Sequence, residues 1–441
     1  MTKSSPENKK KSISICWLRR DLRLNDHAAL YHALKGDHPV LILFIFDQHI
    51  LEQLSNKADA RVTFIYQTLA KINQELQQQK SALLVKYGRP SEVWKAIVDE
   101  FDVKAVYANQ DYEPYARERD AEIHKLLASK DIPFFTFKDQ VIFEKDEVVK
   151  ADGKPYTVFT PYFRIWQKKL DDFYVKSYPI KHYLKNLCQI DVPPIPSLKK
   201  IGFEESEQKF PTVHFETKVA DYDQFRDFPA KDATTRIGIH LRFGTVSIRQ
   251  AVQEALQQKA DKWLSELAWR EFYMMILWHF PSTVSHAFKP DYDQIQWRND
   301  EAEFEAWCQG KTGYPLVDAG MRQLNEIGFM HNRVRMVVAS FLCKHLLIDW
   351  RWGEAYFAEK LLDYEQASNI GGWQWACGSG NDAAPYFRIF NPEAQLKKFD
   401  PKMAYVFKWA PAYRSAIAPV PIVEHTFARD RALKAYKKAL R

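Results

Sequence analysis

The segment DKWLSELAWREFYMMILWHF, residues 261–280, carries chemically active side chains at the spacing of a helix. Four of them recur every three or four residues, which puts them on one helical face: Trp263, Glu266, Arg270 and Tyr273. Trp269 lies beside that face. A carboxylate, a guanidinium and several aromatic rings crowded together are unlike a plain core stripe. The alternative is a half-buried helix with a local Glu266–Arg270 pair worth about 0.3–0.5 kcal/mol, and periodicity alone leaves both interpretations open.

A second helical segment begins with MHNRVRM at 330–336. Helical spacing puts Asn332, Arg335 and Met336 on one face and points Arg333 in another direction. Two arginines that point apart can serve two partners, for instance an internal carboxylate and an external phosphate. Solvated arginines at the start of a helix are the alternative interpretation.

The densest segment is LLDYEQASNIGGWQWACGSGNDAAPYFRIFNP, residues 361–392. Its acidic, amide, aromatic and basic side chains are Asp363, Glu365, Asn369, Trp373, Trp375 and Arg388. The whole chain has only 15 glycines, so their concentration here indicates backbone packed closely against a flat aromatic ligand. Further upstream, Thr234, Thr235 and Gly238 precede a helical stretch and could bind a phosphate, although this pattern alone is common.

The elements that must position these residues fall into two classes. Apolar runs rich in β-branched residues predict parallel strands at 12–18, 40–46, 82–86, 104–108 and 132–137. Helical patterns at 58–79 and 114–129 alternate with them, which predicts an α/β domain with a doubly wound parallel sheet over 12–138. RRDLRLND occupies 19–26, after the first strand, so the dinucleotide fingerprint GxGxxG is absent there.

The rest of the chain is organised differently. Residues 139–212 are proline-rich, include short helices such as 162–170, and predict a connector that wraps between domains. From 213 to 441 the pattern predicts an all-α domain, with apolar residues at helical spacing in 261–280, 314–328 and 332–347.

Composition narrows the class of protein. Lys and Arg number 63 against 56 Asp and Glu, a net charge of +7 that only weakly indicates a nucleic-acid partner. Five scattered cysteines without a CxxC pair argue against zinc, iron–sulfur clusters and disulfides, so we expect no metal site. Without a run of about 18 apolar residues, and with the polar start MTKSSPENKKK, we expect a cytoplasmic protein with neither a membrane segment nor a signal peptide.

Five motifs occur in a fixed order: WLRRDLRLNDHAAL, LAWREFY, MHNRVRM, DWRWGEAYF and GGWQWACGSGNDAAPYFRIFNP. Over nearly the full chain they resemble the photolyase/cryptochrome family, and within it most closely the class I cyclobutane pyrimidine dimer photolyases. The resemblance implies an α/β antenna domain, a wrapping connector and a helical domain that binds FAD, which agrees with the architecture predicted above. It also implies a monomer whose partner is ultraviolet-damaged DNA and which associates with the nucleoid through that DNA.

The resemblance implies a bent FAD, active as FADH⁻, in the helical domain. The positions that match its contacts are Tyr222, Thr234, Thr235, Arg236, Ile237, Gly238, Trp263, Arg335, Asp363, Tyr364, Glu365 and Asn369. Among them, Tyr222 and the run 234–238 would face the phosphates, Arg335 would pair with Asp363, and Asn369 would face flavin N5. A charged arginine near the ring stabilises an anionic reduced flavin.

The implied substrate is a cyclobutane pyrimidine dimer flipped out of the duplex, and photolyases are themselves a standard example of base flipping. Matching lesion and DNA contacts are Arg226, Glu266, Trp269, Arg270, Tyr273, Asn332, Arg333, Met336, Trp375 and Gln395. Trp269 and Trp375 would form two walls of the pocket, and Met336 would line it. Glu266 and Asn332 would hydrogen-bond the pyrimidine edge, and Glu266 would also stabilise the substrate radical anion.

In the implied repair reaction, one electron passes from excited FADH⁻ to the dimer and returns after the cyclobutane ring has opened. Trp373, Trp350 and Trp297 match the family's chain of tryptophans, which carries electrons from the surface to oxidised FAD. Their spacing by itself would indicate only core packing.

Two alternatives within the family are repair of the (6-4) photoproduct and light signalling without repair. The (6-4) enzymes usually carry histidines in the region of MHNRVRM, so Asn332 and Met336 favour the cyclobutane dimer. Plant-type cryptochromes generally replace the asparagine at N5 with aspartate and carry a C-terminal extension. Asn369 and the end of the chain soon after its last helical segment favour the enzyme. Two positions depart from the family pattern: Gly238-Ile239 replaces Ser-Pro, and Glu365 replaces Asp.

Asn109 and Glu113, in YANQDYEPYARERD, resemble the region where related domains bind a second chromophore. That chromophore is a folate, a deazaflavin or a flavin in different relatives, and some bind none. A surface carboxylate beside a proline turn is the alternative interpretation of Glu113. We expect any second chromophore to lie in the N-terminal domain.

Overall fold

The computed structural model describes residues 10–415 and 419–440. The expectation that the chain has no signal peptide was based on residues 1–11, and most of these lie outside the described residues. The chain divides into two compact units: residues up to 142 with 172–210 and 243–251, and residues 143–171 with 211–242 and those from 252 onward. Segments of the predicted connector, 139–212, thus belong to both units. One helix, α10 (Ile248–Gln257), begins in the first unit and ends in the second.

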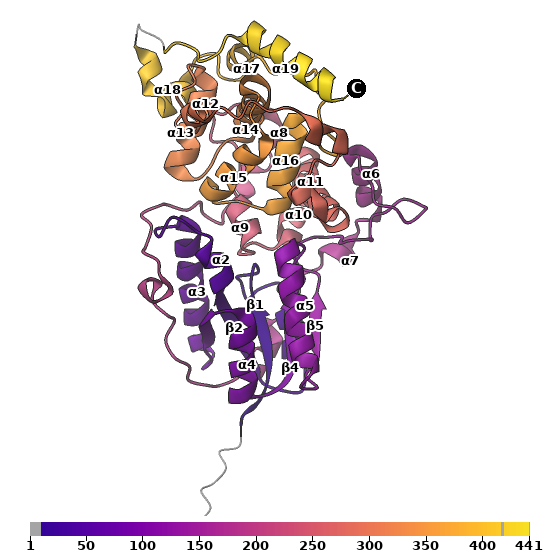
Figure 1. The fold of residues 1–441 in the computed structure, drawn as a ribbon. Helices are drawn as coiled ribbons and strands as arrows, with labels where there is room; N and C mark the ends of the chain where they lie inside the picture. Colours follow the sequence, from indigo (N-terminus) through magenta and orange to yellow (C-terminus); the bar gives the residue numbers. More distant parts are fainter. Residues whose placement is uncertain (1–9, 416–418, 441) are drawn as a thin grey trace, which may run out of the picture. The chain divides into compact units, whose positions relative to one another are not determined.

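A five-stranded parallel sheet in the order β3-β2-β1-β4-β5 forms the centre of the first unit (Figure 1). The strands are β1 (Ser12–Leu18), β2 (Val40–Asp47), β3 (Leu83–Gly88), β4 (Asp102–Asn109) and β5 (Phe134–Phe137). All five predicted strands are confirmed. The helices are α1 (Ala28–Leu34), α2 (Gln48–Glu52), α3 (Ala60–Gln78), α4 (Pro90–Glu100), α5 (Pro114–Ala128) and α7 (Asp172–Val175). Short 3-10 helices cover Lys181–Asn186 and Leu198–Ile201.

Alternation along β1 explains how this sheet is buried on both faces. Ile13, Ile15 and Trp17 share one face and belong to a core cluster with Trp94 of α4 and Ile123 of α5. The rings of Trp17 and Trp94 meet edge to face at 5.5 Å. Right-handed crossovers from each strand to the next parallel one place α4 and α5 together on this face and α1 and α3 on the other.

The turn after β1 is held by hydrogen bonds and ion pairs within the first unit. Asn109, at the end of β4, is 2% exposed and donates to Asp21 at 2.7 Å. Arg20 pairs with both Asp111 and Glu113 at 3.1 Å. Asn109 and Glu113 thus contact protein partners, and their match to a second-chromophore region stays a prediction.

Helices make up almost all of the second unit. They are α6 (Phe159–Lys169), α8 (Tyr222–Phe225), α9 (Gly238–Arg242), α11 (Asp261–His279), α12 (Glu301–Cys308), α13 (Pro315–Ile327), α14 (Asn332–Ser340), α15 (Trp350–Lys360), α16 (Gln366–Cys377), α17 (Pro392–Phe399), α18 (Ala404–Trp409) and α19 (His425–Ala439). Short 3-10 helices cover Glu216–Lys218, Pro281–Val284, Pro290–Gln294 and Pro411–Arg414. The predicted helices at 162–170, 261–280 and 314–328 are confirmed.

The helical spacing predicted over 332–347 is confirmed from Asn332 to Leu346, but the pitch of the helix changes within the segment. The α-helix ends at Ser340, a wider π-helical turn covers Phe341–Leu346, and Leu347 adopts a left-handed φ of 52°. The wider turn buries all six of its side chains, including Lys344, whose ammonium donates to the Tyr386 carbonyl at 3.1 Å. A run of apolar residues this short cannot distinguish the two helical pitches, so the sequence did not reveal the change.

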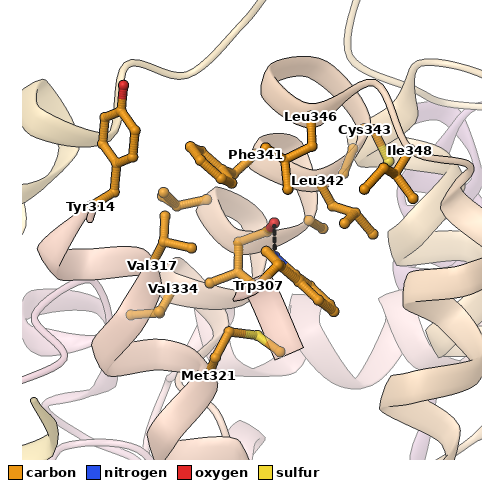
Figure 2. Packing of buried hydrophobic residues seen from close by; sticks show 14 of the residues in the cluster. Trp307, Tyr314, Val317, Met321, Val334, Phe341, Leu342, Cys343, Leu346 and Ile348 are labelled. Carbon is orange, nitrogen blue, oxygen red and sulfur yellow. Dashed lines mark hydrogen bonds between the residues drawn. The ribbon is translucent and has the colours of Figure 1, made fainter. Parts of the chain in front are cut away.

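Figure 2 shows the core of the second unit, where α12, α13, α14 and the π-helical turn meet. Trp307 lies at its centre and donates its indole N–H to the Val338 carbonyl at 3.2 Å, so burial of the ring leaves no unsatisfied donor. Val317, Met321 and Phe341 pack in the same cluster. This core supports the helices that carry the site described below.

A buried ion-pair network fastens the start of α10 to the rest of the first unit. Asp139, 2% exposed, accepts from Arg249 at 2.7 Å and from Arg23 at 2.6 Å. Arg249 also pairs with Asp26 at 2.8 Å. Burial alone would raise the pKa of Asp139, but the two guanidinium groups hold that pKa well below its ordinary value.

Asp139→Asn should lower the free energy of unfolding at pH 7 by about 3–5 kcal/mol, because Arg23 loses its carboxylate partner and Arg249 keeps only Asp26. The folded-state pKa of Asp139 is depressed, so its contribution is complete above the unfolded pKa near 4 and is lost as the pH falls below it. Urea unfolding of wild type and variant at several pH values should therefore converge in acid. Asp99→Asn, on the exposed side of α4, is the control; an equal effect there would contradict the prediction.

Candidate functional site

A cavity of about 420 Å³ lies in the second unit, within the range of small-molecule sites. Thirteen residues that the sequence singled out line it: Arg226, Glu266, Trp269, Arg270, Tyr273, Asn332, Arg335, Met336, Asp363, Glu365, Asn369, Trp373 and Trp375. Its other lining residues are Lys262, Ala339, Phe357, Leu361, Ser368 and Gly372. Of these, only Gly372 belongs to the glycines from which the sequence predicted a close approach of backbone to a ligand. Residues predicted from separate motifs thus meet around one space.

Helical phase determines which predicted residues reach the cavity. On α14, Asn332, Arg335 and Met336 line it, as their common face predicted. Arg333 does not line the cavity: one guanidinium nitrogen pairs with Asp227 at 2.7 Å, and the other donates to the Met336 sulfur at 3.9 Å. Arg333 and Arg335 are two residues apart, so the pitch of an α-helix places their side chains on different faces of α14.

Trp263 of α11 does not reach the cavity, although three residues of its predicted face do. It is 3% exposed, and its ring stacks on Phe215 with centroids 5.5 Å apart. Trp263 therefore packs the start of α11 against the segment before α8.

Glu266 has its closest ion-pair partner outside its own helix. Its carboxylate accepts from Arg226 at 2.5 Å, a partner that the spacing along α11 did not predict. Arg270, the partner considered from the sequence, donates to the Leu241 carbonyl at 3.3 Å. Burial alone would lower the pKa of Arg226, but Glu266 raises it. Burial, followed by the charge of Glu266, also raises the pKa of Tyr222.

The ion pair predicted between Arg335 and Asp363 is confirmed. One guanidinium nitrogen of Arg335 lies 3.1 and 3.0 Å from the two carboxylate oxygens of Asp363, and its Nε donates to the Met330 carbonyl at 2.7 Å. The start of α9 packs closely against the same carboxylate, since a Cβ at Gly238 would come within 2.7 Å of Asp363 Oδ2. Gly238 thus connects the run 234–238 to the cavity rim.

Several predicted cofactor and DNA positions do not line the cavity: Tyr222, Thr234, Thr235, Arg236, Ile237, Gly238, Trp263, Tyr364, Arg333 and Gln395. Arg236 belongs to the run that leads to Gly238, has a left-handed φ of 54° and pairs with Asp232 at 3.2 Å. A non-glycine residue in that conformation is strained. Gln395 lies in α17 and has a buried amide oxygen without a hydrogen-bond partner among the described residues.

Glu354 of α15 is a functional candidate that sequence reasoning missed. Asn369 donates its amide nitrogen to the Glu354 carboxylate at 2.9 Å and to the Glu354 carbonyl at 3.1 Å. Burial raises the pKa of this carboxyl group. Glu354 stands inside DWRWGEAYF, but nothing in its spacing could reveal contact with a residue on another helix.

The three predicted tryptophans differ in depth. Trp373 lines the cavity, and its ring fills the space beside Gly353 of α15, where a Cβ would come within 2.1 Å of the indole. Trp350, one turn before Gly353, is 2% exposed. Trp297 is half-buried at the edge of the same core and meets the ring of Tyr436 at 6.0 Å.

The adjacent glycines of α16 have different roles. A Cβ at Gly371 would lie 2.2 Å from the ring of Tyr273, so Gly371 permits contact with α11. A Cβ at Gly372 would meet no atom within 4 Å, and Gly372 lines the cavity. The expected close approach of backbone to a ligand thus applies to Gly372. At Gly371 the backbone instead packs against the ring of Tyr273.

Two absences bear on the kind of site. Across residues 10–415 and 419–440, no group of three or more His, Cys, Asp or Glu side chains is arranged to hold a metal ion. In the same described part of the chain, no helix combines the length and apolar character needed to cross a membrane.

Comparison with known proteins gives two family matches. Residues 14–181 match the family model described as DNA photolyase, and residues 263–418 match the FAD binding domain of DNA photolyase. The cavity lies largely within the second range. A deoxyribodipyrimidine photo-lyase from Synechococcus is 37% identical over 470 residues, covering 96% of both chains.

Solved structures are similar over almost the entire chain. A bacterial class III photolyase from Agrobacterium tumefaciens superposes with a TM-score of 0.86 at 32% identity, covering 99% of both chains. A cryptochrome from Synechocystis gives a TM-score of 0.84 at 25% identity, covering 97% of this chain and 100% of the other.

The residues around the cavity fit a flavin. Trp373 and Phe357 offer apolar rings, and the Arg335–Asp363 pair offers charge and hydrogen bonds. Gly372 leaves open space in the wall, where a side chain would otherwise project. A mainly apolar cavity with a few convergent polar groups is the usual environment of a flat organic cofactor.

Gly371→Ala and Gly372→Ala form a matched pair at adjacent helical positions. Gly371→Ala should lower the free energy of unfolding by about 1–3 kcal/mol, because its Cβ overlaps the Tyr273 ring. Gly372→Ala should preserve or raise it by about 0.5–1 kcal/mol, since alanine is the better helix former and meets no atom. Chemical unfolding measures both; similar losses in the two variants would contradict this packing.

Proposed function

The chain belongs to the DNA photolyase family, and on that premise we propose that it is a light-driven repair enzyme that splits cyclobutane pyrimidine dimers in DNA. One observation carries the proposal: residues matching lesion contacts and residues matching flavin contacts line the same cavity. Short separation between donor and acceptor is what transfer of an electron requires. We further propose that the enzyme acts as a monomer in the cytoplasm, on the DNA of the nucleoid.

The flavin end of the cavity is the part around Arg335, Asp363 and Asn369. When bound as FADH⁻, the cofactor would supply one electron under blue light and receive it back after the ring has opened. Arg335 places a positive charge there, which favours a reduced anionic ring. The amide nitrogen of Asn369 is engaged by Glu354, so its carbonyl oxygen is the atom left to accept a hydrogen bond from the flavin.

The lesion end is the part around Glu266, Trp269, Asn332, Met336 and Trp375. The indoles of Trp269 and Trp375 offer flat apolar surfaces to the two pyrimidine rings and exclude water from them. Glu266 and Asn332 offer polar atoms for the pyrimidine edge. Their position inside a partly buried cavity makes each such hydrogen bond stronger than it would be in water.

The DNA backbone would lie outside this cavity. Arg333 does not line it and lies next to the ring of Phe399, and Gln395 lies on the same helix as that ring, α17. Phe387, 63% exposed, stands in the loop after α16 that also contains Arg388. Exposed apolar and basic side chains in the loop that follows a lining helix suit a duplex from which a base pair has been extruded.

Repair of the (6-4) photoproduct and light signalling without repair are the competing functions. Asn332 and Met336 line the cavity from the region where (6-4) enzymes usually carry histidines, and this supports the cyclobutane dimer. Similarity to a cryptochrome means that the fold does not separate repair from signalling. Activity on defined lesions separates all three.

The deciding experiment illuminates the reduced holoenzyme with two oligonucleotides, one with a cyclobutane thymine dimer and one with a (6-4) photoproduct. Chromatography should show restored thymines from the first substrate only, and only under light. A dark reaction and heat-treated enzyme are the controls. Repair of the (6-4) lesion would replace the proposed specificity. An enzyme with reduced FAD that leaves both lesions intact would overturn the repair proposal in favour of signalling.

Trp373→Phe should separate activation from repair. Photoreduction of oxidised FAD should slow greatly, because the innermost member of the proposed tryptophan chain is lost. Dimer splitting by chemically reduced enzyme should persist, since that reaction does not use the chain. Flavin absorbance under illumination measures photoreduction, and the repair assay measures dimer splitting. Trp352→Phe, on the same helix as Trp350 but outside the proposed chain, is the control. Equal loss of both activities in Trp373→Phe would contradict these roles.

A further inference from the structure

Trp269, one proposed wall of the lesion site, is itself held by an aromatic stack. Its ring lies 3.7 Å from that of Phe159, centroid to centroid, with only 11° between the planes. Phe159 is 7% exposed, begins α6 and does not line the cavity. Phe272 and Tyr273 meet the same indole at an angle, 5.6 and 5.5 Å away. The parallel ring of Phe159 therefore fixes the plane of the indole.

The same short segment also holds the loop that follows the opposite wall. Asp382 accepts a hydrogen bond from the Phe159 backbone N–H at 2.9 Å. Asn381 donates to the Thr157 carbonyl at 3.1 Å. A Cβ at Gly380 would come within 3.2 Å of the Gln374 backbone and 3.3 Å of the Trp375 backbone nitrogen, so this loop packs against the end of α16 that carries Trp375. Residues 157–159 thus contact the ring of one wall and the loop that follows the helix of the other.

The chemistry at the start of α6 favours this arrangement. No side chain adjacent in sequence caps the helix, whose N-cap residue is Val158. Asp382 supplies the missing acceptor from more than 200 residues away. A carboxylate at the N-terminus of an 11-residue helix also interacts favourably with the helix dipole. The loop is therefore anchored at this point by charge as well as by hydrogen bonding.

We propose that residues 157–159 are a positioning element for the lesion site, fixing the plane of Trp269 and its separation from Trp375. This inference rests on the proposed function. A ligand with two joined flat rings binds best when its walls are already set, because ordering them on binding costs affinity. A leucine at 159 would fill much of the volume, but it would not hold an indole in one plane.

The first test measures binding of the holoenzyme to an oligonucleotide with a cyclobutane dimer and to the undamaged oligonucleotide. Phe159→Leu should weaken binding of the dimer about three- to tenfold, the value of an aromatic pair. Affinity for undamaged DNA, FAD content and flavin photoreduction should stay at wild-type levels. Phe159→Tyr, which keeps the ring, should restore binding. Phe280→Leu is the control, because Phe280 follows the same helix as Trp269 but meets the rings of His279 and Phe288 instead.

Near-ultraviolet circular dichroism gives a readout that does not depend on repair. Trp269→Phe identifies the signal of this indole, and Phe159→Leu should lose the same signal while Phe280→Leu keeps it. The anchor is tested separately: Asp382→Ala should weaken dimer binding, whereas Asp382→Asn, which keeps an acceptor oxygen but not the charge, should bind more tightly than Asp382→Ala and slightly less tightly than wild type. If Phe159→Leu does not fold, comparison of Asp382→Ala with Asp382→Asn tests the positioning role of residues 157–159.

Unchanged dimer affinity and an unchanged indole signal in Phe159→Leu would overturn the inference. So would a parallel loss of affinity for damaged and undamaged DNA, which would indicate general destabilisation. Failure of the proposed function is distinguishable, since wild-type enzyme would then show no preference for the dimer while the dichroism still reported on Trp269.

Discussion

The close approach of α16 to α11 and α15 is the contact on which the site depends. Two glycines make it possible, because a side chain at Gly371 would overlap Tyr273 and one at Gly353 would overlap Trp373. In each case an aromatic ring occupies the space that a Cβ would take. With helices this close, other residues of α16, including Asn369 and Gly372, line a cavity that α14 also borders.

Three pairs of opposite charges at this cavity join different elements of the structure. Arg226 meets Glu266, Arg335 meets Asp363, and Arg242 lies 3.8 Å from Glu365. Burying a lone charge would cost several kcal/mol, so pairing lets the cavity contain both signs without a ligand. The same pairs hold their side chains in defined positions, and this is the condition for electrostatic stabilisation during a reaction.

Support for the site extends beyond the residues that line it. Glu354 holds the amide of Asn369, and Phe159 covers the indole of Trp269. Neither residue lines the cavity. A side chain with a fixed rotamer needs such neighbours, because otherwise the entropy of its alternatives opposes binding. Residues 157–159 belong to a stretch that the sequence identified only as connector, yet they contact the ring of Trp269 and the loop after α16.

The sequence by itself determined every strand of the sheet and the orientation of individual helical faces. Asn332, Arg335 and Met336 line the cavity and Arg333 does not, because these directions follow from the pitch of one helix. The family motifs also identified the flavin domain. The sequence did not determine which side chains meet across different elements. Examples are the pair of Glu266 with Arg226, the hydrogen bond of Asn369 to Glu354, and the stack of Phe159 on Trp269. Spacing along the chain encodes contacts within one element, whereas these contacts join elements separated in sequence, so only the tertiary structure decided them.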